Sequence, residues 1–300
     1  MPFIQLDSLN IHYEHQSKGD IPIILLHGNF GSWHYWQPFL QGLNQGYCAY
    51  APDFRGCGDS QITESGYDII TLCADIVQFA DHLQLDKFHL VGHSLGGAVA
   101  QQLAGTHPER ILTLSLVATA PADGLPSLTK NSYNSRFFSP QNTFKLLEAI
   151  GLKRKVLAAT FKKTMPKLGS KPNFLNMVVD DALKMDMKAL SGFIETLKDW
   201  KGNKFLKQFN FPVILLYGDL DTVVPLAPLM RMKNQIKDCH FHTFRNVGHA
   251  PQLENATAFN NVLMSFIEGR HAATEATASS QVIHWLTGLK QKISTLFKKP

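Results

Sequence analysis

The chain has 300 residues and a mass of 33.5 kDa, which is enough for one large domain or for a core domain with an insertion. Hydrophobic residues make up 44% and charged residues 18%, which excludes a chain that is disordered throughout. Four scattered cysteines without a CxxC pair argue against a disulfide scaffold and a zinc ribbon. The formal charge of +5 is compatible with a nucleic acid, a membrane surface or an ordinary substrate as partner.

The sequence predicts neither a membrane span nor a signal peptide. The longest apolar runs of the chain, such as residues 21–26, are far shorter than the roughly 20 residues that a spanning helix needs. Residues 1–13 contain Asp7, no basic n-region and no small-residue cleavage site. We therefore expect this segment to belong to the fold and the protein to be cytoplasmic.

Short apolar runs alternate with longer helical patterns along the chain. The predicted strands are residues 3–6, 11–13, 21–26, 47–51, 88–91, 111–117, 212–217 and 240–244. The predicted helices are residues 69–83, 95–106 and 258–267. This alternation predicts an α/β fold, in which a mostly parallel sheet is flanked by helices.

Residues 121–207 break this alternation. The segment shows no convincing strand, is helical in composition and lies between two predicted strands, so we expect an insertion. It holds sixteen Lys and Arg and seven Asp and Glu, a net charge of +9. Residues 1–120 and 208–270, the predicted core, then carry −7, and the remaining residues 271–300 carry +3.

The last thirty residues form a third predicted part. Residues 271–280 are rich in Ala, Thr and Ser, which is typical of a linker. Beyond them Trp285, Leu289 and Ile293 lie on one apolar face at helical spacing, with lysines around it. A basic amphipathic helix of this kind predicts peripheral contact with a membrane surface or a partner, and the alternative is that it packs back on the domain.

The segment Gly92–Gly97, with the sequence GHSLGG, carries the strongest chemical signal. It follows a predicted strand and opens a predicted helix, the context in which a G-x-S-x-G turn exposes a serine nucleophile. Glycines at positions 92 and 96 allow the close approach of neighbouring chain that such a turn requires. A chance glycine-rich turn is the alternative. The context favours Ser94 as nucleophile, with the N–H of Leu95 facing a developing oxyanion.

A serine hydroxyl needs a base, and the base needs an acid to orient it. His249 follows the last predicted strand and precedes the last helix, so its loop lies at the same sheet edge as Ser94. Asp221 lies just after the preceding strand. The order Ser94, Asp221, His249 is the order of a serine, acid and histidine in one family of such triads.

The chain resembles the α/β-hydrolase fold superfamily over roughly residues 3–270. Four motifs carry the resemblance: HGNFGS at 27–32, DFRGCGDS at 53–60, GDLDTVVP at 218–225 and GHAPQLE at 248–254. The resemblance implies an eight-stranded, mostly parallel sheet with a helical cap inserted after the sixth strand, where residues 121–207 lie. It also implies a histidine-glycine oxyanion loop, in which the N–H of Asn29 or of Phe30 completes the oxyanion hole.

Two other carboxylates compete with Asp221 for the role of acid. Asp219 lies two residues earlier in the same loop, and Asp123 follows the sixth predicted strand, where some members of the family keep their acid. The family's usual position favours Asp221.

Candidate pocket residues come from three places in the sequence: His27, Trp33, His93, Phe137 and Phe138. For both histidines the alternative is a packed, hydrogen-bonded structural role. For Trp33 it is a place in the core, because large aromatic residues on helices are more often packed than exposed to ligand.

A serine at the turn argues against epoxide and haloalkane chemistry, for which the family uses an aspartate. The sequence therefore predicts a serine hydrolase that cleaves esters or thioesters with an apolar acyl group. The alternatives are a carbon–carbon bond hydrolase or another cofactor-free activity of this fold, and a non-catalytic binding protein. We expect no metal, no organic cofactor and no nucleic-acid partner, but a small-molecule ester substrate and peripheral membrane contact through the basic cap and tail.

Overall fold

The computed structural model describes residues 2–125 and 140–270. Phe137, Phe138 and the predicted C-terminal helix lie outside these residues, so the predictions made for them stay predictions. The chain divides into two units, residues 1–260 and 261–300. The last helix, α11 (Ala256–Ile267), begins in the first unit and ends in the second.

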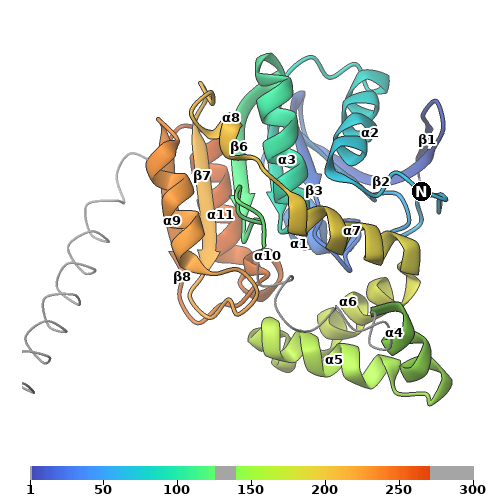
Figure 1. Cartoon of the computed structure of the whole chain (residues 1–300). Helices are drawn as coiled ribbons and strands as arrows, with labels where there is room; N and C mark the ends of the chain where they lie inside the picture. The colour runs from blue at the N-terminus through green and yellow to red at the C-terminus, as the bar shows by residue number, and fades with distance from the viewer. Residues whose placement is uncertain (1, 126–139, 271–300) are drawn as a thin grey trace, which may run out of the picture. The chain divides into compact units, whose positions relative to one another are not determined.

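One eight-stranded sheet organises the first unit (Figure 1). Its strands in chain order are β1 (Phe3–Gln5), β2 (Asn10–Ser17), β3 (Ile21–Leu26), β4 (Tyr47–Pro52), β5 (Phe88–His93), β6 (Ile111–Val117), β7 (Val213–Gly218) and β8 (Cys239–Phe244). Their spatial order is β1-β2-β4-β3-β5-β6-β7-β8, and every pair from β4 to β8 is parallel. The predicted mostly parallel sheet is therefore confirmed. Its antiparallel pairs are β1 with β2 and β2 with β4.

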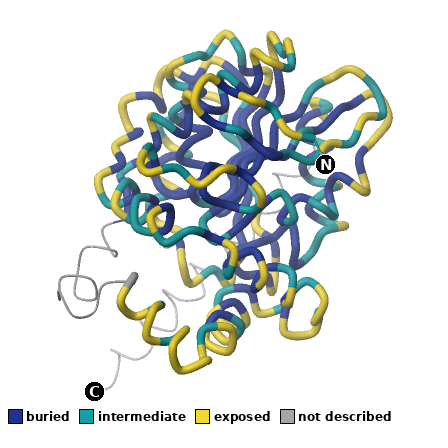
Figure 2. The backbone as a smooth tube through the Cα atoms, turned by 90° about the vertical axis from the view of Figure 1, so that its right-hand side faces the viewer, coloured by how far each residue is buried: buried dark blue, intermediate teal, exposed yellow. Residues whose placement is uncertain are grey.

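Helices cover both faces of this sheet. In the core they are η1 (Trp33–Trp36), α1 (Gln37–Gln41), α2 (Ile69–His82), α3 (Leu95–Thr106), η2 (Pro108–Arg110), α9 (Leu226–Gln235) and α10 (Pro251–Glu254). Helices α2 and α3 pack side by side on one face, and α1 lies behind the sheet (Figure 1). The residues of strands β5 and β7 are buried throughout, and Figure 2 shows the interior of the molecule as a dark blue tube. Burial on both faces explains the apolar run of β7, whereas β5 contains two buried histidines, His89 and His93.

Between β6 and β7, in the segment predicted as an insertion, the described residues form five helices and a 3₁₀ turn. They are α4 (Pro140–Ala149), α5 (Lys153–Thr164), η4 (Pro166–Ser170), α6 (Pro172–Lys184), α7 (Met187–Asp199) and α8 (Asn203–Leu206). Helices α4, α5 and α6 lie together beyond the end of the sheet (Figure 1), and we refer to α4–α6 with η4 as the cap. Helix α7 returns to contact α2, and α8 contacts α3.

No helix within residues 2–125 and 140–270 combines the length and the apolar character needed to cross a bilayer.

The packing of α3 against α8 leaves no room for a side chain at Gly105. A Cβ atom there would approach the ring of Phe205 to under 3.0 Å. We expect Gly105→Ala to lower the free energy of unfolding, because overpacking costs about 1–3 kcal/mol whereas the better helix propensity of alanine returns about 1 kcal/mol. Urea unfolding measures the change. Gly169→Ala is the control, because a Cβ there meets nothing within 4 Å. An unchanged or higher stability of Gly105→Ala would contradict this packing.

Candidate active site

The turn between β5 and α3 places Ser94 in a strained backbone conformation, with φ +53° and ψ −113°. A Cβ at Gly92 would approach the backbone of Gly96 to under 3.0 Å, and one at Gly96 would do the same to the carbonyl of His27. Only glycine leaves room for these approaches. The turn therefore holds Ser94 out at the edge of the sheet, at the N-terminus of α3.

The structure brings Ser94, His249 and Asp221 together, although 155 and 28 residues separate the pairs along the chain. The Oγ atom of Ser94 lies 3.1 Å from Nε2 of His249, and Nδ1 of His249 lies 2.8 Å from Oδ2 of Asp221. An ionised carboxylate only accepts hydrogen bonds, so Nδ1 of His249 carries a proton and donates a hydrogen bond to Asp221. Nε2 is then the free base that faces the serine hydroxyl.

Asp221 is held as an ionised carboxylate. Its side chain is fully buried, and its Oδ1 atom accepts the N–H groups of Val223 at 2.7 Å and Val224 at 3.0 Å. Burial by itself raises the pKa of Asp221, but the charge and hydrogen bond of His249 and the two N–H donors outweigh it, so the pKa lies below its ordinary value.

The two competing carboxylates make other contacts. Asp219 accepts the N–H of Val247 at 3.2 Å, and Asp123 forms an ion pair with Arg231 at 2.6 Å. Of the three predicted acids, Asp221 is the one that bonds to His249.

The two candidates for the second oxyanion donor differ in their surroundings. The N–H of Phe30 donates to Oδ1 of its neighbour Asn29 at 3.0 Å, and Phe30 has a positive φ of 63°. For the N–H of Asn29, no acceptor lies among the residues that the structure describes. The N–H of Leu95 belongs to the first turn of α3, where N–H groups have no partner within the helix.

Both pocket histidines are buried and bonded to backbone. His27 accepts the N–H of Phe54 at Nε2, 3.0 Å away, so its Nδ1 carries the proton and donates to the carbonyl of Gly28 at 2.8 Å. His93 donates from Nε2 to the carbonyl of His249 at 2.8 Å. These contacts give both rings the structural role that the sequence left as an alternative.

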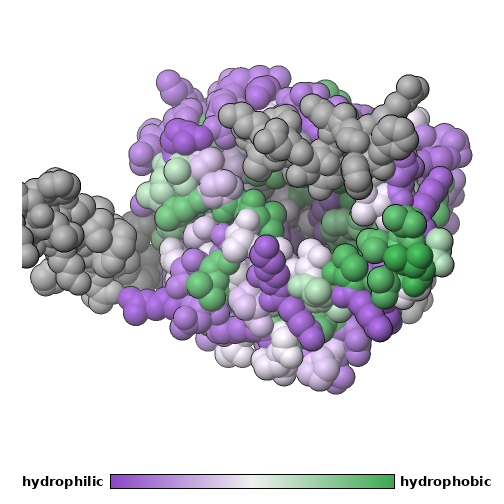
Figure 3. Space-filling model, turned by 60° about the horizontal axis from the view of Figure 1, so that its bottom comes forward, coloured by the Kyte–Doolittle hydropathy of each residue, from purple (hydrophilic) through white to green (hydrophobic). Residues whose placement is uncertain are grey.

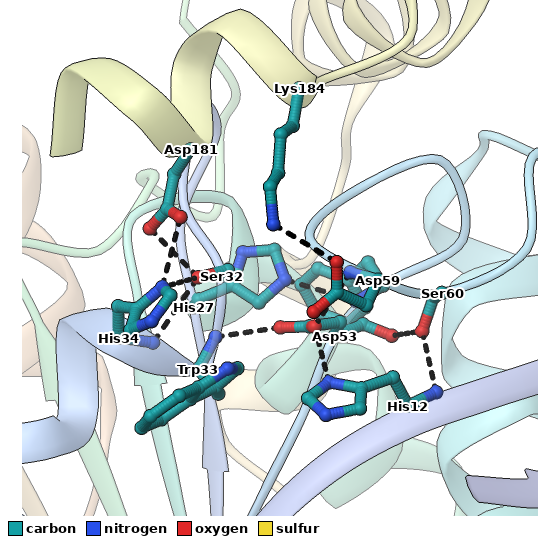
Figure 4. Close-up of polar contacts among 11 residues, drawn as sticks. His12, His27, Ser32, Trp33, His34, Asp53, Asp59, Ser60, Asp181 and Lys184 are labelled. Atoms are coloured by element: carbon teal, nitrogen blue, oxygen red, sulfur yellow. Dashed lines mark hydrogen bonds and ion pairs between the residues drawn. The ribbon is translucent and has the colours of Figure 1, made fainter. Parts of the chain in front are cut away.

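Trp33 lies in η1, next to a network of polar contacts that joins the cap to the core (Figure 4). Its backbone N–H donates to Asp53, and its ring packs on His34 with centroids 4.1 Å apart. In the same network the cap residue Asp181, which is 2% exposed, accepts from Ser32 at 2.7 Å and from His34 at 2.9 Å.

The network was not predicted, because an aspartate in a basic segment gives no sign that it is buried. Partial burial by itself lowers the pKa of His34, but the hydrogen bond and the negative charge of Asp181 outweigh it, so the pKa lies above its ordinary value. Lys184, one turn further along α6, reaches Asp59 of the core at 3.0 Å. The contacts of Asp181 and the exposed ion pair of Lys184 thus tie helix α6 to the core.

An apolar wall faces the oxyanion loop from the cap. The ring of Phe30 lies 6.1 Å from that of Phe144 in α4 and 6.3 Å from that of Phe161 in α5. Within residues 2–125 and 140–270, no group of three or more His, Cys, Asp or Glu side chains could hold a metal ion.

Residues 21–256 match the protein family described as alpha/beta hydrolase fold. RutD of Variovorax paradoxus is 30% identical over 266 residues, which cover 86% of this chain and 96% of RutD. A pimeloyl-(acyl-carrier protein) methyl ester esterase of Salmonella newport is 28% identical over 278 residues, with 85% of this chain and 97% of the esterase covered. The solved structure of an enol-lactonase from Burkholderia xenovorans has a TM-score of 0.75 at 18% identity, covering 89% of this chain and 100% of the lactonase, which is a likeness of fold.

The contacts around His249 predict the effect of removing the acid. Asp221→Asn keeps the shape of the side chain but offers an amide that can hold the imidazole in the wrong tautomer, so we expect ester turnover to fall by about 10³- to 10⁴-fold. Asp219→Asn and Asp123→Asn are matched controls and should remain within about threefold of the wild type. Steady-state kinetics of the three variants decide, and a large loss in either control with a small one in Asp221→Asn would refute the assignment.

Strand β5 carries two buried histidines whose burial predicts a pH effect on stability. Burial lowers the pKa of His89 to about 4, and burial with the nearby His249 lowers that of His93 to about 3. Both are near 6.5 in the unfolded chain. As the pH falls below about 6.5, the unfolded chain takes up protons that the folded chain does not, so stability is lost progressively toward pH 4.

Between about pH 7 and pH 5.5 each histidine should contribute a loss of about 1 kcal/mol in unfolding free energy. His89→Gln removes one of these contributions without touching the site. Its stability should therefore fall less steeply with pH than that of the wild type. Urea unfolding at both pH values measures the slopes, and equal slopes in His89→Gln and wild type would contradict a neutral buried His89.

Proposed function

The chain belongs to the α/β-hydrolase fold family, and on this premise we propose that it is a serine hydrolase that cleaves carboxylic esters or thioesters with an apolar acyl group. The observation that carries the proposal is the continuous hydrogen-bonded path from Ser94 Oγ through both nitrogens of His249 to Asp221. A buried acid, a base with its free nitrogen toward a hydroxyl, and a strained turn that exposes this hydroxyl together suit acyl transfer.

The reaction follows from these positions. Ser94 Oγ attacks the substrate carbonyl carbon while His249 Nε2 takes the hydroxyl proton, and Asp221 stabilises the imidazolium that forms. His249 then gives the proton to the leaving alkoxide or thiolate, which leaves an acyl-enzyme on Ser94. A water molecule, deprotonated by the same nitrogen, attacks the acyl carbon and releases the carboxylic acid and the free serine.

We propose Leu95 and Asn29 as the two donors of the oxyanion hole. Both would supply backbone N–H groups, one from the first turn of α3 and one from the loop after β3. The Phe30 N–H is already bonded to the Asn29 side chain, and this bond supports Asn29 over Phe30. A carbonyl oxygen gains most from these donors as it becomes negatively charged, which favours the transition state over bound substrate.

The apolar surroundings of Phe30 support an apolar acyl group. Phe144 and Phe161 of the cap face this residue, and Leu157 of α5 is buried in the same cluster. The Salmonella relative is named as a methyl ester esterase, which supports an ester as the cleaved linkage.

Membrane contact through the cap and tail stays a prediction. Its support in the described residues is a group of exposed apolar side chains on α4 and at the start of α5, Leu146, Ile150, Leu152 and Val156. Figure 3 shows apolar side chains beside strongly hydrophilic ones on this side of the molecule. Surfaces of this mixed kind are typical of interfacial binding.

A fluorophosphonate probe tests the proposed nucleophile. The probe should label the wild type, and Ser94→Ala should lose both labelling and the turnover of p-nitrophenyl esters, the latter by about 10⁴-fold or more. A series of esters of increasing acyl length should show kcat/KM rising with chain length, because each buried methylene contributes about 0.8 kcal/mol. Labelling that persists in Ser94→Ala would refute the nucleophile, and labelling without ester turnover would favour a carbon–carbon bond hydrolase.

A further inference from the structure

The backbone of His249 is bonded on both sides. Its carbonyl accepts from Nε2 of His93, which is the last residue of β5 and directly precedes Ser94. Its N–H donates to the carbonyl of Thr164 at 2.8 Å, and Thr164 is the last residue of cap helix α5. The cap therefore supplies one of the two backbone contacts that hold the histidine in place.

Glu254 in α10 joins the histidine loop to the cap a second time. The residue is 2% exposed. Its Oε1 atom accepts the N–H groups of Gly248 at 2.9 Å and Ala250 at 3.2 Å, on either side of His249, and its Oε2 atom accepts the N–H of Lys167 in η4 at 3.1 Å. Burial raises the pKa of Glu254, although these three donors oppose the shift.

The two segments are also in close steric contact. A Cβ atom on Gly248 would approach both the carbonyl of Thr164 and the ring of Pro166 to under 3.0 Å. Lys171, at the start of α6, donates from Nζ to the carbonyls of Leu253 and Glu254 at 3.0 Å. The cap thus contacts the histidine loop through main chain, side chain and packing within eight residues of sequence, 164–171.

We propose that residues 164–171 of the cap are part of the support of the catalytic histidine, and that Glu254 is the positioning residue that couples the two. The inference rests on the proposed function of His249. One carboxylate binds three N–H groups from two segments. A displacement of the cap would remove the Thr164 acceptor of the His249 N–H and the Lys167 donor that helps to hold Glu254, and would so let the imidazole turn away from Ser94. The cap then controls the competence of the base in addition to shaping the pocket.

The contacts of Asp181 between cap and core make a different contribution. Asp181 bonds to Ser32 and His34, and neither residue belongs to the histidine loop. Loss of these contacts loosens α6 without removing an acceptor from the neighbours of His249. Asp181→Asn therefore distinguishes general loosening of the cap from loss of support at the histidine.

Glu254→Gln tests the coupling, because the variant keeps the size of the side chain but turns one oxygen into an N–H donor that faces a backbone N–H. We expect kcat for a p-nitrophenyl ester to fall by about 10- to 100-fold, with KM within about threefold, and the rate of fluorophosphonate labelling to fall with kcat. Glu195→Gln, at an exposed glutamate in α7, is the matched control and should leave both rates unchanged.

Gly248→Ala tests the same contact without altering a charge, because its new Cβ atom pushes against Thr164 and Pro166. It should also lower kcat at nearly constant KM, and the double variant Gly248→Ala, Glu254→Gln should lose much less than the product of the two single effects, since both act on one contact. The proton on Nδ1 of His249, which forms the hydrogen bond to Asp221, gives an independent readout. Its downfield NMR resonance should shift or broaden in both variants and stay unchanged in Asp181→Asn.

Folded variants at Glu254 and Gly248 with wild-type kcat and an unchanged histidine resonance would overturn the proposal, even if their thermal stability fell. Equal losses of kcat in Asp181→Asn and Glu254→Gln would also overturn it, because they would point to general loosening of the cap. If Glu254→Gln does not fold, Gly248→Ala decides alone. A wild type that neither hydrolyses the ester nor reacts with the probe would refute the proposed function instead.

Discussion

The candidate site depends on one steric constraint, the absence of side chains two residues before and two residues after Ser94, at Gly92 and Gly96. The backbone of β5 turns into α3 so sharply that the chain at Gly92 and Gly96 touches neighbouring main chain. This closeness allows α3 to start immediately after the strand, with its free N–H groups at the edge of the sheet. Strands β7 and β8 are parallel to β5, so the loops that follow them begin at the same edge of the sheet. Strain at one residue thus creates a point where a hydroxyl, an imidazole and a carboxylate can meet.

The sequence predicted a site residue where a side chain of suitable chemistry directly followed a predicted strand or lay in the loop after one. Ser94 and His249 follow predicted strands and are accordingly close together. Spacing alone could not separate Asp219 from Asp221, because both lie in one loop. The structure separates them through backbone donors: one oxygen of Asp221 accepts the N–H groups that follow it, which turns the other oxygen toward His249.

Features that depend on main-chain groups and distant partners could not be predicted. The carbonyl of Thr164 and the occupied N–H of Phe30 belong to the backbone, which leaves no trace in residue type. The predicted strand at residues 11–13 was too short for a similar reason. In the structure β2 runs from Asn10 to Ser17, because pairing with β4 extends it through polar, half-exposed residues that interrupt its apolar pattern.

The charge pattern acquires a physical meaning from the cap contacts. A segment of +9 is inserted in a core of −7, and Lys184 and Lys188 of the segment pair with Asp59 and Glu64 of the core. These pairs are largely exposed, and such pairs contribute about 0–1 kcal/mol each, so they align the two parts more than they bind them. The buried contacts of Asp181 and Glu254 are desolvated and geometrically demanding. Part of the basic character of the segment is therefore paired within the molecule, in addition to the buried contacts of the two carboxylates between cap and core.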